Sequence, residues 1–252
     1  MSDPLFDLSG QTALVSGASR GIGASIAQLL AAHGAHVVCA SRKRENCEET
    51  VAAIAAAGGS AEAQAMHVGD PDSIEALFAT LDAAGTTCSI LINNAAANPY
   101  FGPALDMTLP AYEKTVEVNL RGYFWTTVQA ARRMQQGGSI VNIASVNARR
   151  PAFGQLIYSM TKAGIVNMSE GFAKELAPQA IRVNAILPGL TDTKFASALT
   201  GNPKILDLMM RMIPLQRVAQ PNEIAPMALF LAAPAASYVT GATFAVDGGY
   251  LA

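Results

Sequence analysis

Residues 12–23 read Thr12-Ala13-Leu14-Val15-Ser16-Gly17-Ala18-Ser19-Arg20-Gly21-Ile22-Gly23, and this stretch decides the fold. Its first five residues are mostly apolar, which is typical of a short strand buried in a parallel sheet. Three glycines then lie between that strand and a helical run that continues through Ala32. Glycine permits a tight turn and lets a phosphate group approach the backbone N–H groups at a helix N-terminus. The stretch therefore predicts a strand, a phosphate-binding turn and a helix, although its Gly-x-x-x-Gly-x-Gly spacing differs from the common Gly-x-Gly-x-x-Gly fingerprint.

Strand-like and helix-like segments alternate from this stretch to the end of the chain. Such alternation predicts an α/β protein with a doubly wound parallel sheet of seven strands and helices on both faces. Because no linker, repeat or low-complexity tract interrupts the 252 residues, we expect a single Rossmann-type domain over residues 1–252. The expected strands are 12–16, 36–40, 61–68, 89–93, 139–144, 181–186 and 243–246, and the expected helices after the first are 45–57, one that starts at Pro71, 112–134, 158–177 and 220–233.

The composition excludes several classes of protein. A hydrophobic share of 51% and a charged share of 14% exclude a disordered chain. The net charge of −2 gives no electrostatic reason to expect nucleic acid or an anionic membrane as a partner. The three cysteines, Cys39, Cys47 and Cys88, have neither metal-like spacing nor a disulfide framework, which favours a reducing compartment and predicts no metal site. With no signal-peptide pattern and no run of about 18 apolar residues, we expect a cytoplasmic protein without a membrane span.

A basic run follows the second expected strand, where residues 40–44 read Ala-Ser-Arg-Lys-Arg. A site for NAD would place Asp or Glu here to accept hydrogen bonds from the adenosine ribose. Arg42 instead offers a guanidinium to a 2′-phosphate, and Arg20 in the glycine turn can approach from the other side. The alternative is a solvated basic cluster, but cations are disfavoured at the start of a helix unless an anion binds there. The run therefore predicts NADP(H) as the cofactor.

Tyr158 and Lys162 stand four residues apart in an expected helix and so share one of its faces. An unperturbed phenol, with a pKa of about 10, is a poor acid–base catalyst at neutral pH. A nearby ammonium favours the phenolate, so we expect Lys162 to lower the pKa of Tyr158. An ordinary tyrosine and a solvated lysine on an amphipathic helix would give the same pattern, and the other motifs must decide between the two interpretations.

Taken together, these motifs resemble the classical, single-domain branch of the short-chain dehydrogenase/reductase family. The resemblance covers essentially the whole chain, and the motifs occur in the family's order and at its spacing. Segments 36–44, 67–69 and 94–102 look most like the NADP-dependent carbonyl and retinal reductases. The further residues that carry the resemblance are Asn93-Asn94-Ala95-Ala96, Asn119, Ser145 and Pro188-Gly189.

The resemblance implies a catalytic role for four residues. Tyr158 would exchange a proton with the substrate oxygen, and Lys162 would lower its pKa and bind the nicotinamide ribose. Ser145 would hydrogen-bond the substrate carbonyl and stabilise developing oxyanion charge. Asn119 would hold a relay water near Lys162. Considered singly, Ser145 could be a turn residue at a strand end, and Asn119 a buried polar residue that bonds the backbone.

The resemblance also implies a set of cofactor contacts. Asn94 and Ala95 would lie along the adenosine side, and the segment from Pro188 to Thr193 would grip the nicotinamide carboxamide. Where the family often has Asp, this chain has His67, and the family's Asn-Asn-Ala-Gly is here Asn-Asn-Ala-Ala. The full expected set is Gly17, Ser19, Arg20, Gly21, Ile22, Gly23, Ser41, Arg42, His67, Val68, Asn94, Ala95, Tyr158, Lys162, Pro188, Gly189, Thr191 and Thr193.

Residues 194–212 are rich in leucine, isoleucine and methionine. By the resemblance this segment is a mobile lid over the substrate, and methionines suit a surface that repacks around varied apolar groups. A place in the core or in a subunit contact is the alternative. Arg149 and Arg150 could instead receive an anionic acyl carrier. The candidate substrate contacts are Tyr100, Asn147, Phe153 and Phe195.

The sequence thus predicts an NADP(H)-dependent oxidoreductase that interconverts a hydrophobic ketone or aldehyde and its alcohol, with Tyr158 as general acid and base. The resemblance implies a homotetramer. One alternative is a 3-oxoacyl-carrier-protein reductase. A second, from another class, is a catalytically silent NADP-binding regulator, against which the intact Ser145, Tyr158 and Lys162 argue.

Overall fold

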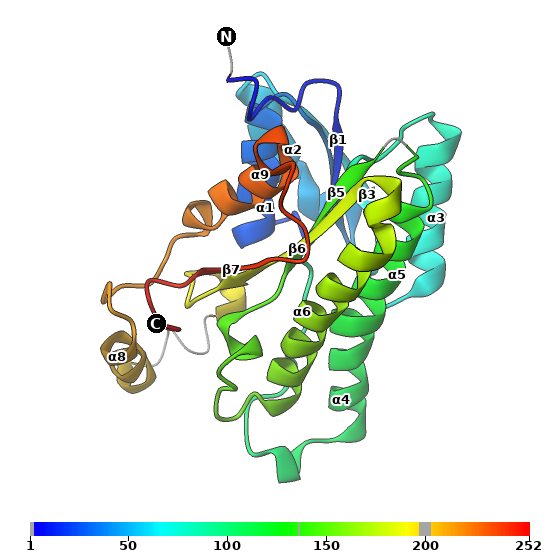
Figure 1. Cartoon of the computed structure of the whole chain (residues 1–252). Helices are drawn as coiled ribbons and strands as arrows, with labels where there is room; N and C mark the ends of the chain where they lie inside the picture. Colours follow the sequence, from blue (N-terminus) through cyan, green and yellow to red (C-terminus); the bar gives the residue numbers. More distant parts are fainter. Residues whose placement is uncertain (1–2, 136, 197–202) are drawn as a thin grey trace.

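Seven parallel strands form one sheet in the order β3-β2-β1-β4-β5-β6-β7 (Figure 1). The computed structural model describes residues 3–135, 137–196 and 203–252, apart from the side chains at 204 and 205. All seven predicted strands are present, with ends that differ by a few residues at most. The strands are β1 Thr12–Ser16, β2 His36–Ser41, β3 Ser60–Ala65, β4 Ile90–Asn93, β5 Gly138–Ile143, β6 Ile181–Pro188 and β7 Thr243–Val246.

Helices cover both faces of the sheet, as Figure 1 shows. On one face α1 contacts α2 and α9, and on the other α3 contacts α5 while α4 contacts α6. The doubly wound α/β prediction is therefore confirmed. The described helices are α1 Gly21–Ala32, α2 Glu48–Ala56, α3 Pro71–Ala83, α4 Leu109–Val116, α5 Gly122–Ala131, α6 Leu156–Leu176, α8 Pro203–Met212 and α9 Ala225–Ala232.

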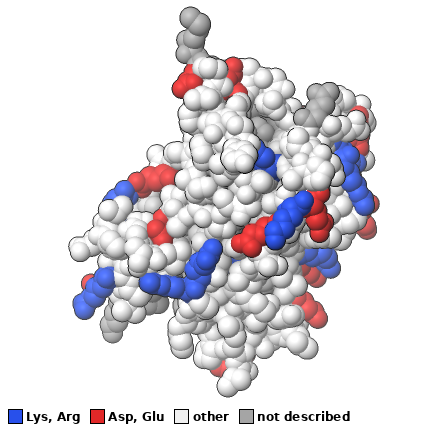
Figure 2. Space-filling model, viewed as in Figure 1, with Lys and Arg blue, Asp and Glu red and all other residues white. Residues whose placement is uncertain are grey.

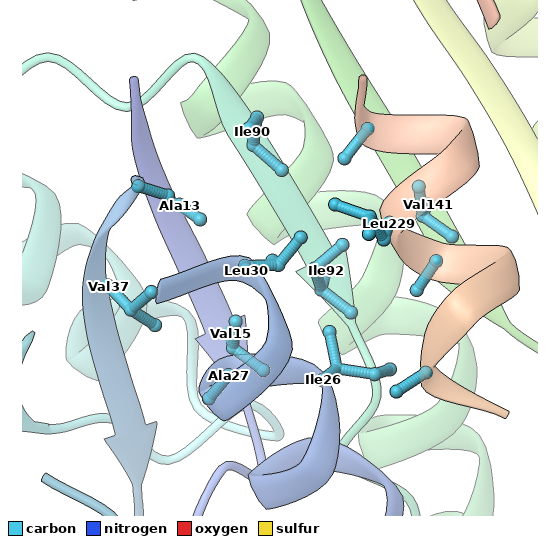
Figure 3. Packing of buried hydrophobic residues seen from close by; sticks show 14 of the residues in the cluster. Ala13, Val15, Ile26, Ala27, Leu30, Val37, Ile90, Ile92, Val141 and Leu229 are labelled. Atoms are coloured by element: carbon cyan, nitrogen blue, oxygen red, sulfur yellow. The ribbon is translucent and has the colours of Figure 1, made fainter. Parts of the chain in front are cut away.

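The strands are apolar on both sides because both sides are buried. Ala13 and Val15 of β1 point into the cluster beneath α1 and α9, whereas Leu14 between them points into the cluster on the opposite face. Successive side chains of a strand alternate between its two faces, so a strand covered on both sides is a continuous apolar run. Figure 3 shows the first cluster, in which Ile26 of α1 and Leu229 of α9 lie over the sheet.

Two predicted elements are wrong in detail. The third strand ends at Ala65 rather than at residue 68, because the next residues form a turn that begins α3. In that turn Asp70 accepts a hydrogen bond from the Asp72 N–H, and the Ser73 hydroxyl accepts one from the His67 N–H at 2.9 Å. Side chains that bond the backbone in this way favour a helix start over a continued strand.

The helix predicted over residues 112–134 is not continuous. It consists of α4, a π-helical turn over Glu117–Arg121, and α5. Gly122, at the start of α5, lies so close to the backbone carbonyl of Val68 that a Cβ there would overlap it. The π turn is where Asn119 becomes fully buried, and such turns are often found at functional sites.

The surface shows no extended field of one charge on the face drawn in Figure 2, where acidic and basic side chains are interspersed. The three cysteines are buried and unpaired. None of the helices that the structure describes is both long and apolar enough to span a bilayer.

The order of the strands places the site. β1 lies between β2 and β4, so the chain winds outward in both directions from β1 and β4. In doubly wound sheets, ligands bind at the carboxyl edge near the point where the winding direction changes. The segments that follow β1, β2, β4, β5 and β6 therefore meet at this edge.

Candidate active site

The glycine turn between β1 and α1 is tightly folded against its neighbours. Gly17 and Gly21 have positive φ angles of 69° and 57°, a backbone conformation that residues with a side chain rarely adopt. A Cβ at Gly23 would overlap the Gly17 carbonyl oxygen. Any other residue at these three positions would therefore strain the backbone or overlap a neighbouring atom.

Asn94, which follows β4, holds this turn in place. Its side-chain amide donates hydrogen bonds to the carbonyl oxygens of Ser16 and Gly17, at 3.0 and 3.2 Å. The Ser16 hydroxyl in turn accepts hydrogen bonds from the N–H groups of Asn94 and Ala95. The Asn94 side chain therefore shapes the turn, and the expected contact of Asn94 along the adenosine stays a prediction.

The N-terminus of α1 has the features of an anion site. The first turn of an α-helix has N–H groups without intrahelical partners. Here Arg20 at the N-cap makes no side-chain capping hydrogen bond, and the first turn of α1 contains no acidic residue. The partial positive charge of the helix end is thus not offset by a side chain, which favours a bound phosphate.

The structure brings the two predicted phosphate-binding arginines to neighbouring strand ends. Ser16 of β1 pairs with Ala40 of β2, and the N–H of Gly17 donates to the carbonyl oxygen of Ala40. The segments that carry Arg20 and Arg42 therefore leave adjacent strands at the same edge, and both side chains are exposed. The Ser41 hydroxyl donates to the Lys43 carbonyl at 2.6 Å and so shapes the turn that presents Arg42.

His67 lies beside Lys114, which the sequence analysis did not single out. The two side-chain nitrogens, Lys114 Nζ and His67 Nε2, are 3.3 Å apart. Because an ammonium only donates, Nε2 accepts, and a neutral ring then carries its proton on Nδ1. Nδ1 is buried and has no hydrogen-bond partner among the described residues. An aspartate at this position would offer a ligand a hydrogen-bond acceptor, whereas His67 offers the Nδ1–H donor.

Asn119 is fixed between two segments of the chain. Its amide oxygen accepts from the Ala97 N–H at 2.8 Å, and its amide nitrogen donates to the Ala97 carbonyl at 3.0 Å. The same nitrogen donates to the Thr161 hydroxyl at 3.0 Å. Asn119 therefore ties the segment after β4 to the helix that carries Lys162.

Tyr158 and Ser145 come together at the carboxyl end of β5. Ser145 follows this strand, and its side chain lies close enough to the Tyr158 phenol to lower the pKa of that group. The Ser145 oxygen also accepts from the Asn147 N–H at 3.1 Å, which orients it. The Phe195 ring lies 5.8 Å from the Tyr158 ring, measured between centroids.

Lys162 is almost completely buried beside two tyrosines. Its ammonium donates to the Ile143 carbonyl oxygen at 2.7 Å, and the Tyr123 hydroxyl donates to the same oxygen at 3.0 Å. The Lys162 nitrogen is 5.3 Å from the Tyr123 ring centroid and 5.5 Å from that of Tyr158. Tyr123 was missed by sequence reasoning because its position in the middle of an expected helix gave no signal.

The pKa values of this cluster are governed by burial. Burial lowers the pKa of Lys162 to about 7, since it penalises the charged form. Burial raises the pKa of Tyr158, and the Ser145 side chain acts in the opposite direction. The prediction that Lys162 lowers the Tyr158 pKa therefore does not describe the net effect here. Tyr158 is a protonated phenol at neutral pH, the form that can donate a proton.

Gln155, another residue that the sequence did not indicate, organises the substrate side. Its side-chain oxygen accepts from the amide of Asn98 at 3.2 Å and from that of Asn147 at 3.4 Å. Gln155 is buried and stands at the N-cap of α6, three residues before Tyr158. It places the predicted substrate residue Asn147 next to the start of the helix that carries the tyrosine.

The other predicted substrate residues are less well placed. Phe153 is 87% exposed, so its ring does not line the site. The Tyr100 hydroxyl donates to the Pro103 carbonyl at 2.8 Å, within its own loop. Of the predicted lid, residues 197–202 lie outside the described residues. The rest includes the turn Lys194–Ala196, which carries Phe195, and α8.

The segment that leaves β6 and the segment that approaches α9 are bridged at a narrow neck. Thr191 bridges to Ala219, the Asp192 N–H donates to the Ala219 carbonyl, and the Ala219 N–H donates to the Leu190 carbonyl. Within the neck, the Thr191 hydroxyl donates to the Gly189 carbonyl at 3.0 Å. A Cβ at Gly21 would lie 3.2 Å from the Thr193 methyl group, so this segment reaches the glycine turn.

Two hollows elsewhere on the surface contain none of the candidate residues. A groove of about 180 Å³ lies between α1 and α2, and a depression of about 490 Å³ lies beside the end of α6. The candidate residues instead lie at the carboxyl edge of the sheet, where the glycine turn and the buried Tyr158–Lys162 pair are placed.

Comparisons with known proteins agree with this arrangement. A family model described as Enoyl-(Acyl carrier protein) reductase matches residues 17–251. Dehydrogenase/reductase SDR family member 4 of Oryctolagus cuniculus is 37% identical over 244 residues, which cover 96% of this chain and 94% of the relative. A solved short-chain type dehydrogenase/reductase from Mycobacterium marinum is 34% identical with a TM-score of 0.93, covering 98% of this chain and 97% of the other. A gluconate 5-dehydrogenase from Burkholderia cenocepacia, solved in complex with NADP and tartrate, is 29% identical with a TM-score of 0.94, covering 98% of each chain. Similarity over nearly the full length of both partners shows that the chain belongs to the short-chain dehydrogenase/reductase family, whose members are NAD(P)-dependent oxidoreductases.

Proposed function

We propose that the protein is an NADP(H)-dependent oxidoreductase that interconverts a hydrophobic ketone or aldehyde and its alcohol. The observation that carries the proposal is the buried Tyr158 phenol, whose pKa the Ser145 side chain lowers and whose ring lies 5.8 Å from the Phe195 ring. A protonated phenol beside a serine hydroxyl can bind a carbonyl oxygen from two directions.

The bound cofactor would supply the hydride that adds to the carbonyl carbon. Ser145 would donate a hydrogen bond to the carbonyl oxygen and stabilise the negative charge that develops on it. Tyr158 would transfer its proton to that oxygen, and would take a proton back when an alcohol is oxidised. Lys162, which lies beside the Tyr158 ring, would favour the phenolate left after proton transfer.

The residues present fit a phosphate-bearing dinucleotide. The uncapped N-terminus of α1 would hold the pyrophosphate. The other turn and strand-end residues of the predicted set would lie around it, namely Gly17, Ser19, Gly21, Ile22, Gly23, Ser41, Asn94 and Ala95. Arg42 and Arg20 would bind the 2′-phosphate from neighbouring strand ends. Pro188, Gly189, Thr191 and Thr193 would face the nicotinamide, and His67 with the Val68 backbone the adenine. The solved relative with bound NADP supports this choice of cofactor.

An apolar substrate is supported by the side chains near Tyr158. Phe195 lies against the tyrosine ring. Further along the proposed lid, α8 carries the large apolar residues Leu206, Leu208, Met209, Met210 and Met212. An acyl carrier is supported less, because the Arg150 guanidinium donates one hydrogen bond to the Tyr250 carbonyl at 2.9 Å and so has fewer donors left for an anion.

The direct test is NADPH oxidation over a panel of aryl ketones, aldehydes, a keto sugar acid and a 3-oxoacyl thioester. We expect turnover of the apolar carbonyl compounds by the wild type and loss of at least about 1,000-fold in Tyr158→Phe, within the range that general acid catalysis contributes. Tyr238→Phe is the matched control, since that tyrosine is fully exposed. If the enzyme prefers the sugar acid or the thioester, the proposed class of apolar substrates is wrong. If NADPH binds but no substrate is turned over, the protein is the catalytically silent regulator.

The cofactor assignment is tested by Arg42→Ala. Loss of a charge-assisted contact to the 2′-phosphate should weaken NADPH binding by about 10- to 100-fold, while NADH binding changes little. Arg132→Ala, at an exposed arginine after α5, is the control for loss of charge. Equal weakening of both cofactors would refute the 2′-phosphate contact.

We further propose that residues 1–252 form one domain with a lid at 194–212, and that the protein is a cytoplasmic homotetramer. The burial of all three cysteines as free thiols suits a reducing compartment. Large apolar side chains are exposed around α4, α5 and α6, and such surfaces mark contacts between proteins. Light scattering after size exclusion should give four times the mass of 26.2 kDa. The large apolar side chains exposed around α4, α5 and α6 are Leu105, Leu109, Phe124, Leu156 and Met160.

A further inference from the structure

Residues 247–252 follow β7 and contact three separate loops of the site. At its base, this terminal segment is joined to the loop after β6. The Gly189 N–H donates to the Val246 carbonyl at 3.0 Å. A Cβ at Gly189 would lie 2.7 Å from the Asp247 Cα, so the two backbones are in direct contact.

The second contact is with the residues that leave α8. The Leu215 N–H donates to the Gly248 carbonyl at 3.1 Å. Gly248 and Gly249 have φ angles of 65° and 91°, and a Cβ at Gly249 would lie 2.8 Å from the Pro214 ring. Only glycine permits both the backbone conformation and this approach.

The third contact is with the loop that carries Ser145. The Arg150 guanidinium donates to the Tyr250 carbonyl at 2.9 Å and lies 5.6 Å from the centroid of the Tyr250 ring. Arg150 thus combines a charge-assisted hydrogen bond with a cation–π contact. Its loop is thereby attached to the same six-residue segment that holds the exit of α8.

The terminal segment has a defined shape of its own. The Asp247 carboxylate accepts hydrogen bonds from the N–H groups of Gly249 and Leu251, both at 2.9 Å. Tyr250 and Leu251 pack against the buried cluster that contains Tyr123 and Val146. A segment with its own hydrogen bonds and a packed apolar side can transmit the position of one neighbour to another.

We infer that residues 247–252 act as a brace that fixes the distance between the exit of α8 and the Ser145 loop. Arg150 and Tyr250 are then positioning residues, which act on substrate binding through these two loops without touching the reacting atoms. The part that concerns substrate binding rests on the proposed function. The brace itself rests only on the contacts above.

The test compares Arg150→Met with Arg132→Met. Both arginines lie 5.6 Å from an aromatic ring centroid, but Arg132 stacks on Trp125 at the end of α5, away from the site. Hydrogen exchange of the amides of 203–216 should be about 3- to 10-fold faster in Arg150→Met, the factor expected for one net hydrogen bond. Arg132→Met should leave this exchange unchanged, and Arg150→Lys should restore part of the protection.

Steady-state kinetics complete the experiment. With an apolar ketone, Arg150→Met should raise KM about 3- to 10-fold with kcat unchanged, because the substrate is held less well while the chemistry at Tyr158 is intact. Unchanged exchange would overturn the brace, and faster exchange with an unchanged KM would overturn its role in substrate binding. If the wild type reduces no carbonyl compound, the proposed function fails, and the exchange of 203–216 still decides whether the brace exists.

Discussion

Replacing Lys162 by methionine should change how the stability of the protein depends on pH. Burial holds the pKa of Lys162 at about 7, whereas the ordinary value for the side chain is 10.5. Below pH 7 the lysine is charged in both the folded and the unfolded chain, and the folded protein carries the penalty of a buried ammonium. Between pH 7 and 10.5 the unfolded chain binds more protons, so this penalty is relieved as the pH rises.

The size of the effect follows from the pKa difference. Each pKa unit corresponds to about 1.4 kcal/mol, so between pH 6.5 and 8.5 the Lys162 contribution to the free energy of unfolding should rise by about 2 kcal/mol. The window ends at pH 8.5 because the raised pKa values of Cys39 and Cys88, about 12 and 11, lower the stability once unfolded thiols begin to ionise near pH 9. Methionine at position 162 has no ionisable group, and its unbranched apolar side chain is similar in length to the methylene chain of lysine.

The assay is urea unfolding of wild type and Lys162→Met at several pH values across this window, without cofactor. Only the change of the difference with pH matters, because any loss of packing or of the hydrogen bond to Ile143 adds a constant. Two unfolding curves that stay parallel from pH 6.5 to 8.5 would refute the reasoning. That outcome would mean that the Ile143 carbonyl and the two tyrosine rings offset the desolvation of the ammonium.

Three further predictions concern single side chains. Gly171→Ala, at an exposed position in α6 where no atom lies within 4 Å of the new Cβ, should raise the free energy of unfolding by about 0.5–1 kcal/mol in urea titrations, and a loss would contradict the helix-propensity argument. Gly23→Ala, whose Cβ would overlap the Gly17 carbonyl oxygen, should lower it by about 1–3 kcal/mol and weaken NADPH binding in fluorescence titrations, so a variant of wild-type stability and affinity would show that the turn can relax. Tyr123→Phe leaves the Ile143 carbonyl to Lys162 alone and should therefore raise the pKa of Lys162. The alkaline limb of the pH–rate profile for reduction should then shift to higher pH by about 0.5–1 unit. A purely structural role of Tyr123 would instead lower the rate equally at every pH.

Periodicity and glycine placement were sufficient to predict the sheet. The apolar runs of β1, β4 and β5 are buried on both faces, so their composition alone distinguishes them from the amphipathic helices between them. The π turn between α4 and α5 could not be predicted in this way. It depends on the close approach of Gly122 to the Val68 carbonyl, a contact between residues far apart in the sequence.

The same distinction applies to the site. Tyr158, Lys162 and the glycines were predicted because their spacing within one element defines their geometry. Gln155 and Tyr123 act through carbonyl and amide groups of other segments, so no local pattern indicates them. The pKa of Tyr158 was predicted in the wrong direction for a related reason, since spacing shows a neighbouring charge but does not show how deeply both groups are buried.

The neck at Thr191 and Ala219 bears on how such a protein can change during evolution. Thr191 and Ala219 are bridged where the chain leaves β6 and approaches α9. Residues between them that do not contact Gly21 or residues 248–249 can therefore be exchanged or lengthened without shifting β6 or α9. The entropy of closing a loop grows only slowly with its length, so insertions there are tolerated well. New substrate ranges can therefore arise by changes within this one segment, while the glycine turn and the end of β2, which belong to the first half of the chain, are inherited unchanged.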